Sequence, residues 1–161
     1  MTGAQEVGRG SLETAIAFAA VMHRGQVDKG GEPYILHPLR IMAKMATTEQ
    51  RIAAVLHDVV EDCDVSLEKI RQMFGPVIAE AVDALTRREG ESYMEFIGRA
   101  CGNEIARTVK LADVRDNLDL SRLGRKPTPA DKRRTGKYIA ARKRLLAAGD
   151  DQSVARESDN D

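Results

Sequence analysis

Apolar residues recur every three to four positions along most of the chain, which is the period of an amphipathic helix. Helix start and stop signals separate these stretches, among them Ser11, Ser66, the Gly75-Pro76 pair and the Thr128-Pro129-x-Asp131 sequence. No stretch reads convincingly as a strand. The pattern predicts an all-α domain of seven to eight helices, over residues 11–23, 38–46, 48–62, 66–75, 76–87, 92–101, 103–120 and 128–148.

Two stretches lack this pattern. Residues 25–34 are polar with a Gly pair and are expected to form a loop. After Gly149 few apolar residues remain, so we expect one domain over residues 1–148 and a disordered acidic tail over 149–161.

Composition and charge narrow the function classes. Aromatic residues are 4% of the chain and Trp is absent, so the core must be aliphatic. A formal net charge of zero gives no overall field toward nucleic acid or membranes. The segment 122–144 is an exception, with ten Lys/Arg against one acid. It could attract a phosphorylated substrate, but we favour a helix that docks through Tyr138, Ile139, Leu145 and Leu146.

Cellular location is expected to be cytoplasmic. Cys63 and Cys101 are too few for a disulfide framework, and Glu6 and Arg9 stand where a signal peptide would need an apolar run. Because the formal net charge is zero, nucleic acid and membrane partners are not expected. A homo-oligomer is possible.

The sequence LHDVVED, residues 56–62, gathers unusual chemistry on one helix face. On a helical wheel Ile52, Val55, Leu56, Val59 and Val60 form an apolar stripe, and His57, Asp58, Glu61 and Asp62 lie opposite. This polar face could simply be solvated. However, like charges at these spacings repel, and the end of a helix disfavours anions. A bound cation would offset both costs.

A second acidic position lies in KLADVRDN, residues 110–117. This helix is apolar on two sides, one with Leu111, Val114 and Leu118 and one with Ile105, Val109 and Ala112, so it is expected to be central and buried. Asp113 and Asp116 interrupt the second side. A buried carboxylate needs a partner. That partner could be an arginine elsewhere, or Asp113 could complete a metal site with Asn117 one turn away.

Histidine and aspartate together would suit manganese, iron or zinc with coordination positions left open for water. The histidines available are His23, His37 and His57. His37 stands at a helix start, whereas His23 is interpreted as a packing residue near the 25–34 loop. Glu61 and Asp62 would stand beside the ion and handle protons.

Taken together, HRGQ (23–26), GGEPYILHP (30–38), the stretch 53–75 and VKLADVRDN (109–117) closely resemble the HD-type hydrolase domain of RelA/SpoT alarmone enzymes and the stand-alone small alarmone hydrolases. The resemblance covers residues 12–123. It implies a helical HD domain with one divalent ion, manganese in most members and zinc in some, that removes the 3′-pyrophosphate from (p)ppGpp. The synthetase domain of the long family members has no counterpart in this sequence, so the resemblance implies a hydrolase only.

Matched residue by residue, the resemblance implies the metal ligands His37, His57, Asp58 and Asp113. Glu61 and Asp62 match the catalytic acidic pair. Asn117 matches a residue that contacts the nucleotide, and Lys29 falls in the loop that faces it.

Some positions differ from the bifunctional members, which usually carry Arg at Asp28, Ser at Gly30, His at Asp116 and Arg at Asp119. The metal and catalytic sets are intact while the base-reading set is altered. The matched residues therefore predict metal-dependent phosphohydrolysis, and the resemblance implies a guanosine alarmone as the substrate. An HD-superfamily nucleotidase, an NADPH phosphatase and a non-catalytic nucleotide-binding module are the alternatives.

Overall fold

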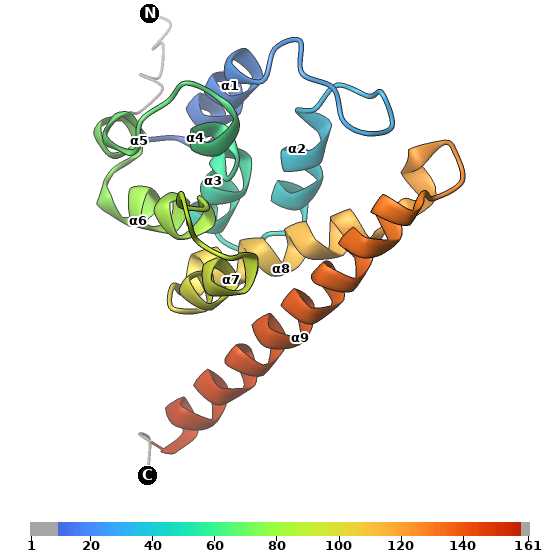
Figure 1. Ribbon diagram of the computed structural model, residues 1–161. Coiled ribbons are helices and arrows are strands. Elements are labelled where there is room, and N and C mark those ends of the chain that lie inside the picture. The colour runs from blue at the N-terminus through green and yellow to red at the C-terminus, as the bar shows by residue number, and fades with distance from the viewer. Residues whose placement is uncertain (1–9, 159–161) are drawn as a thin grey trace, which may run out of the picture.

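The computed structural model describes residues 10–158, with side chains described as far as residue 150. Over this range the protein has nine α-helices, one 3-10 helix (η1) and no strand, which confirms the all-α prediction (Figure 1). The elements are α1 (Leu12–Met22), α2 (Leu36–Ala43), α3 (Thr48–Leu56), α4 (Val59–Asp62), α5 (Leu67–Phe74), α6 (Pro76–Leu85), α7 (Tyr93–Cys101), α8 (Glu104–Leu118), η1 (Leu120–Leu123) and α9 (Pro129–Ser158).

Helix starts follow the polar capping residues that the sequence offers. The Ser11 and Ser66 side chains accept hydrogen bonds from the first turns of α1 and α5, and Pro76 opens α6. The predicted capping box before α9 is present, because the Thr128 amide donates to Asp131 Oδ2 and the Asp131 amide donates to Thr128 Oγ1.

The predicted helix over 48–62 is wrong in one respect that matters for the site. The chain breaks between α3 and α4 at His57 and Asp58, where the Asp58 backbone has φ −108° and ψ 0°. Glu61 and Asp62 therefore belong to the short helix α4 rather than to the end of one long helix. The break turns His57 inward, with 1% of its surface exposed, and excludes the solvated interpretation for this residue.

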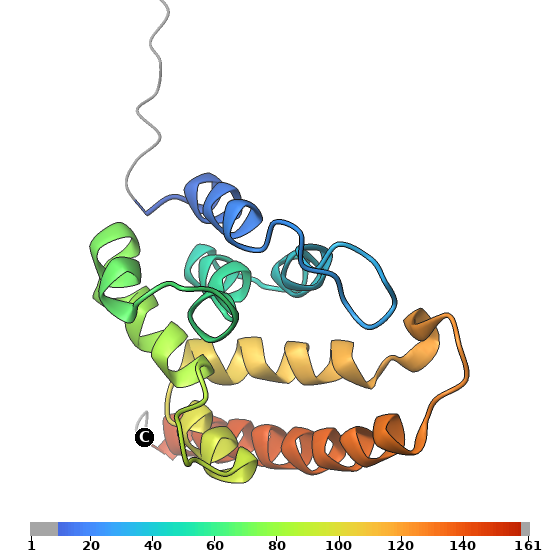
Figure 2. The same ribbon diagram turned by 45° about the horizontal axis from the view of Figure 1, so that its top comes forward.

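Helix α8 is the centre of the arrangement, as its two apolar sides predict. Val109 and Ala112 pack into a cluster with α2, α3 and α6, while Val114 joins a second cluster with α7 and α9. A third cluster joins α1, α3, α5 and α6. Figure 2 shows α8 lying alongside α9, with α1, α2 and α3 on its other side. The second side of α8 faces the inside of the domain, which explains why acids there are buried.

Helix α9 differs from the prediction at its end and on its face. It continues to Ser158, beyond the predicted helix end near 148, and residues 159–161 lie outside the described range. The disordered acidic tail over 149–161 stays a prediction. Ala141 and Leu145 are the buried contacts. Ile139 and Leu146, predicted to dock, are 49% and 41% exposed because they fall about a quarter-turn to a half-turn from that line.

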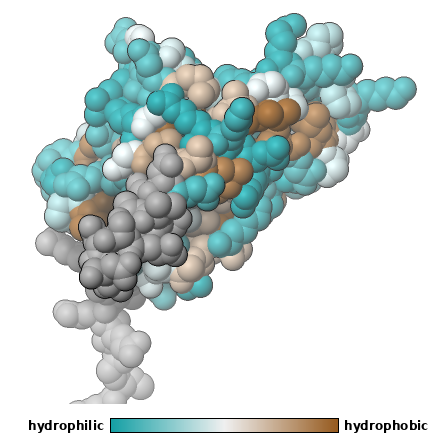
Figure 3. Space-filling model, turned by 90° about the horizontal axis from the view of Figure 1, so that it is seen from below, coloured by the Kyte–Doolittle hydropathy of each residue, from teal (hydrophilic) through white to brown (hydrophobic). Residues whose placement is uncertain are grey.

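In the described part of the chain, no helix combines the length and apolarity that crossing a membrane requires. On the face seen from below, small hydrophobic patches lie between hydrophilic residues (Figure 3). The signal-peptide question concerns residues 1–9, which lie outside the described range.

Candidate metal and substrate site

Three separate elements bring predicted ligands together. His37 comes from the first turn of α2, His57 from the end of α3, and Asp113 from the middle of α8. All three are buried, and each offers a ligand atom within 4.8 Å of those of the others. His37 Nε2 lies 3.1 Å and His57 Nε2 lies 3.9 Å from Asp113 Oδ1. The fold thus directs two imidazole nitrogens at one carboxylate oxygen.

The other ring nitrogen of each histidine fixes its tautomer. His57 Nδ1 lies 2.7 Å from the Ala54 carbonyl oxygen, which can only accept, so Nδ1 carries a proton. His37 Nδ1 is held by Asp116 Oδ2 at 2.8 Å in the same way. Once a cation displaces their second protons, the Nε2 atoms present lone pairs to the cluster. His57 Nε2 is buried and faces two carboxylate oxygens, Asp58 Oδ2 at 2.9 Å and Asp113 Oδ1 at 3.9 Å, an arrangement that suits a metal-ligating nitrogen.

Asp58 lies at the edge of the same cluster. Its Oδ2 atom is 2.9 Å from His57 Nε2 and 4.0 Å from His37 Nε2. The Tyr34 hydroxyl donates a hydrogen bond to this oxygen. Burial opposes ionisation of Asp58, but the charge and proximity of His57 outweigh it and lower the Asp58 pKa to about 2. Asp58 is therefore an anion available to a cation.

Asp113 is held by two neighbours on its own helix. Lys110 Nζ donates to Oδ2 at 2.8 Å, and Asn117 Nδ2 donates to Oδ1 at 2.7 Å. Burial alone would raise the Asp113 pKa, but Lys110 and then His37 lower it well below its usual range. The Lys110 ammonium occupies one oxygen, so Oδ1 is the atom that faces the histidines. Asn117 supports Asp113 in addition to its predicted role at the nucleotide.

In the absence of a cation the histidines compensate these carboxylates by protonation. Burial disfavours the His37 imidazolium, yet hydrogen bonds to Asp113 and Asp116 raise the His37 pKa to about 9. The His57 pKa is also raised, because Asp58 and Asp113 outweigh the effect of burial. A divalent ion can replace these protons, and the mixed nitrogen and oxygen donors suit manganese, iron or zinc. The donor set fits such an ion.

The predicted acidic pair stands beside the cluster and faces solvent. Glu61 Oε1 accepts a hydrogen bond from the Arg87 amide at 2.8 Å, which ties α4 to the loop after α6. Partial burial, then Asp58 and Glu61, raise the pKa of Asp62. A carboxyl group whose pKa is raised keeps its proton more readily and is suited to proton transfer.

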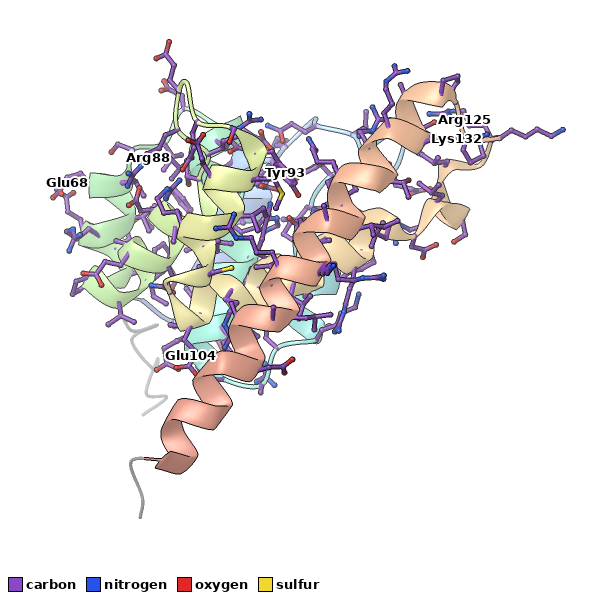
Figure 4. All side chains as sticks on the ribbon, turned by 60° about the horizontal axis from the view of Figure 1, so that its bottom comes forward. Glu68, Arg88, Tyr93, Glu104, Arg125 and Lys132 are labelled. Atoms are coloured by element: carbon purple, nitrogen blue, oxygen red, sulfur yellow. The ribbon has the colours of Figure 1, made fainter. Side chains whose placement is uncertain are left out.

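A cavity of about 630 Å³ opens above the cluster and has the size of a ligand site. Its wall carries seven cationic side chains from α2, the loops, α8, η1 and α9: Lys29, Arg40, Arg87, Lys110, Arg122, Arg134 and Lys137. Aromatic rings of Tyr34, Tyr93, Phe96 and Tyr138 line it as well. In Figure 4 Tyr93 lies between α7 and α9, while Arg125 and Lys132 lie near the start of α9. An acidic floor under a cationic wall suits a metal and a phosphorylated ligand.

Lys29 lines this cavity, and partial burial followed by the nearby Arg134 lowers its pKa. Its contact with a nucleotide stays a prediction. The basic α9 docks through one face, as favoured above, and also lines the cavity through Arg134, Lys137 and Tyr138. Its attraction of a phosphorylated substrate stays a prediction. His23 is buried, its Nδ1 lies 2.8 Å from Gln26 Oε1, and it is not part of the metal cluster among the described residues.

Sequence reasoning missed Tyr34, Lys110 and the two arginines that hold Asp116. Lys110 stands three positions before Asp113 on the same helix, so helical spacing offered a signal for it. Tyr34 lies in the turn before α2 and reaches Asp58, which no local spacing marks. Arg40 and Arg122 reach Asp116 from other elements, and no local pattern marks them. For Asp116 the arginine partner considered above is correct.

Comparison with known proteins gives a consistent picture. A family model described as HD domain matches residues 15–156. A guanosine-3′,5′-bis(diphosphate) 3′-pyrophosphohydrolase, MESH1, of Danio rerio is 38% identical over 127 residues, which cover 69% of this chain and 69% of the relative. A protein of the same activity name from Aquifex aeolicus is 34% identical over 119 residues, which cover 66% of this chain but 17% of that longer protein.

A solved structure shares the fold. It belongs to a metazoan ortholog of SpoT that hydrolyzes ppGpp and plays a role in starvation responses. The two superpose with a TM-score of 0.69 at 30% identity, over 85% of this chain and 84% of the other.

Proposed function

The chain belongs to the HD-domain family, among the relatives of the (p)ppGpp hydrolases, and from that premise we propose that it is a divalent-metal-dependent phosphohydrolase of guanosine alarmones. The reaction is the hydrolysis of the 3′-pyrophosphate of (p)ppGpp to GDP or GTP and pyrophosphate. The observation that carries the proposal is the meeting of His37 Nε2, His57 Nε2 and Asp113 Oδ1 under a cation-lined cavity.

In this proposal His37, His57, Asp58 and Asp113 hold one divalent ion, with manganese favoured by the mixed donors and by the family resemblance. When bound, such an ion lowers the pKa of water and neutralises charge on a phosphoryl group. Tyr34 and Lys110 keep the two carboxylates in place through the contacts described above.

Glu61 and Asp62 are assigned the proton transfers. Glu61 is fixed by the Arg87 amide and is suited to orient the attacking water as an acceptor. Asp62, whose pKa is raised, is suited to hold a proton for the leaving oxygen. The cations on the cavity wall neutralise the phosphates that do not react, as charge-assisted hydrogen bonds to Arg and Lys do elsewhere.

The loop expected to hold the base differs from that of the related enzymes, which is a reason to test other nucleotides. Asp28, at a position where relatives carry Arg, uses its Oδ1 atom to accept hydrogen bonds from the amides of Gly30 and Glu32 at 2.8 and 3.0 Å. It therefore shapes the loop instead of offering a cation to the base. An NADPH phosphatase, a nucleotidase and a non-catalytic binding module are the competing functions.

A substrate panel separates these functions. Manganese-loaded protein is incubated with ppGpp, NADPH and deoxynucleoside monophosphates, and released pyrophosphate and phosphate are measured. We expect pyrophosphate and GDP from ppGpp, and no release after chelation. If phosphate is released only from NADPH, or only from a monophosphate, that compound replaces ppGpp as the proposed substrate. Tight ppGpp binding without release, while the metal is bound, would favour the binding module.

Two further expectations concern the cell. The free thiols of Cys63 and Cys101 support a cytoplasmic location. We propose a small-molecule nucleotide as the ligand; a homo-oligomer stays a prediction that sedimentation can test.

A further inference from the structure

Asp116 anchors two different parts of the site. Its buried carboxylate accepts from His37 Nδ1 at 2.8 Å and from Arg40 Nη2 at 3.1 Å. Arg122 Nη2 donates to the same Oδ2 atom at 3.0 Å and to the Asp116 main-chain oxygen at 2.7 Å. One carboxylate therefore orients a candidate metal ligand and also fixes an arginine of η1.

The η1 turn has little else to hold it. None of its residues is buried, and only Leu120 and Leu123 are partly buried, so hydrophobic packing holds it weakly. Its first residues are organised locally, because Asp119 Oδ1 accepts from the Ser121 amide at 3.1 Å. The Arg122 guanidinium also reaches Asp119 Oδ2 at 3.3 Å. Besides the backbone that joins η1 to the end of α8, the Arg122 side chain ties η1 to the buried Asp116.

The loop over residues 27–33 rests on this turn. A Cβ atom at Gly30 would lie 2.5 Å from the Arg122 main-chain oxygen, a distance that real side chains do not allow. Gly30 does not have a positive φ, so close approach rather than backbone conformation explains the glycine. The loop is itself mostly exposed, with a single bridge between Val27 and Pro33. The Gly30 backbone thus lies against the Arg122 carbonyl, in addition to the hydrogen bonds that the loop makes within itself through Asp28.

We propose that Arg122 is a positioning residue for the nucleotide: its side chain fixes η1 to Asp116, and its main-chain carbonyl seats the 27–33 loop so that Lys29 stands at the cavity. The ligand class, a phosphorylated nucleotide, rests on the proposed function. The placement of the loop by Arg122 is independent of that function. Arg122 also lines the cavity, so a direct contact with phosphate is the role from which positioning must be distinguished.

Limited trypsin digestion reports on the loop without any substrate. Trypsin cleaves after Lys29, and the rate at that bond is followed by mass spectrometry in the manganese-loaded full chain. Arg122→Gln and Gly30→Ala should each raise this rate by about fivefold or more, because both remove the seat of the loop. Cleavage after Lys110, which is buried in α8, reports global unfolding and should stay unchanged.

Matched controls are available on α9. Gly136→Ala adds a methyl group where no atom lies within 4 Å, and Arg142→Gln removes an exposed guanidinium outside the cavity. Both should leave the Lys29 rate unchanged. With ppGpp, Arg122→Gln and Gly30→Ala should raise KM by about tenfold and keep kcat within about twofold. Arg122→Lys, which keeps the charge without the paired hydrogen bonds, should restore only part of either effect.

The outcomes separate the alternatives. If Arg122→Gln raises KM but Gly30→Ala does not, and neither changes cleavage after Lys29, Arg122 only contacts the substrate and the positioning role is overturned. Unchanged KM and unchanged cleavage in both variants would overturn it too. If the wild-type protein hydrolyses none of the nucleotides, the proposed function fails, and the digestion still decides whether Arg122 seats the loop.

Discussion

His37 Nε2 lies 3.1 Å from Asp113 Oδ1, although the two residues come from helices that are far apart in the sequence. This contact joins α2 to the central helix α8 at the place where the break between α3 and α4 delivers His57 and Asp58. Two buried imidazoles, the buried Asp113 carboxylate and the partly buried Asp58 carboxylate at such distances would be costly without compensation. A divalent ion, which the HD domain implies, would provide that compensation at the floor of the cavity.

The Tyr34 hydroxyl is predicted to support the metal site through Asp58. Tyr34→Phe removes this hydrogen bond and should weaken manganese binding by about 10- to 100-fold, the range observed when partners of metal ligands are removed. Calorimetric titration of metal-free protein measures the change. Tyr93→Phe is the matched control, because the buried Tyr93 hydroxyl has no hydrogen-bond partner and its loss should leave manganese affinity unchanged. Equal affinities in wild type and Tyr34→Phe would refute the assignment.

Asp62 is predicted to act on protons rather than on the ion. Asp62→Asn should lower kcat for ppGpp by about 10²- to 10⁴-fold, the usual contribution of a positioned acid or base, while manganese content stays at the wild-type level. Asp64→Asn changes an exposed carboxylate two positions further on and should leave kcat unaltered. A variant at Asp62 that loses the metal together with activity would show that this residue is a ligand instead.

Stability of the metal-free protein should depend on pH through His37. Its pKa is raised to about 9, so the proton stabilises the fold fully below the ordinary value of 6.5 and progressively less as pH rises toward 9. The loss amounts to roughly 3 kcal/mol at most. Urea unfolding in chelator at several pH values measures it. His37→Gln should flatten the decline; an equal decline in that variant would assign it to other groups.

Manganese affinity should change in the opposite direction. The ion must displace the His37 proton, so binding should strengthen as pH rises from 6.5 to 9. Calorimetry in buffers of different ionisation enthalpy reports the protons released. A manganese affinity that is independent of pH over this range would contradict the replacement of protons by the ion.

Chelation should lower the melting temperature. An ion present at 100 times its Kd stabilises the native state by about 2.7 kcal/mol, which for a chain of this size is about 5–10 °C. Thermal scans with and without EDTA measure the difference. Asp113→Asn should melt at the same temperature in both conditions. If EDTA leaves the melting temperature of the wild-type protein unchanged, no ion is bound before the scan.

Much of the fold could be predicted because local signals agree with it. The capping residues Ser11, Ser66 and Thr128 mark helix starts that the structure contains, and the two apolar sides of α8 predict its central position. The break at His57 was not predictable, because residues 52–60 keep an uninterrupted helical pattern of apolar positions. The tertiary contacts of the site, not local propensity, decide the conformation there.

The residues of the candidate site also fall into two groups, those that local sequence reveals and those that depend on tertiary contacts. Residues in short, distinctive sequences, such as His57 and Asp113, could be selected, and the fold brings them together. Arg122 could not, because its importance depends on reaching Asp116 and on the contact of its carbonyl with Gly30, which are set by how η1 folds back. Exposure of Ile139 and Leu146 was missed because α9 is docked along one narrow line of residues.

The metal content of the purified protein tests the central claim most directly. After loading with manganese and removal of free ion, elemental analysis should find about one ion per chain in the wild type and almost none in His57→Ala and Asp113→Ala. Circular dichroism verifies that both variants are helical, and Asp113→Asn serves if the alanine variant does not fold. One ion per chain in folded variants as well as in the wild type would contradict the account.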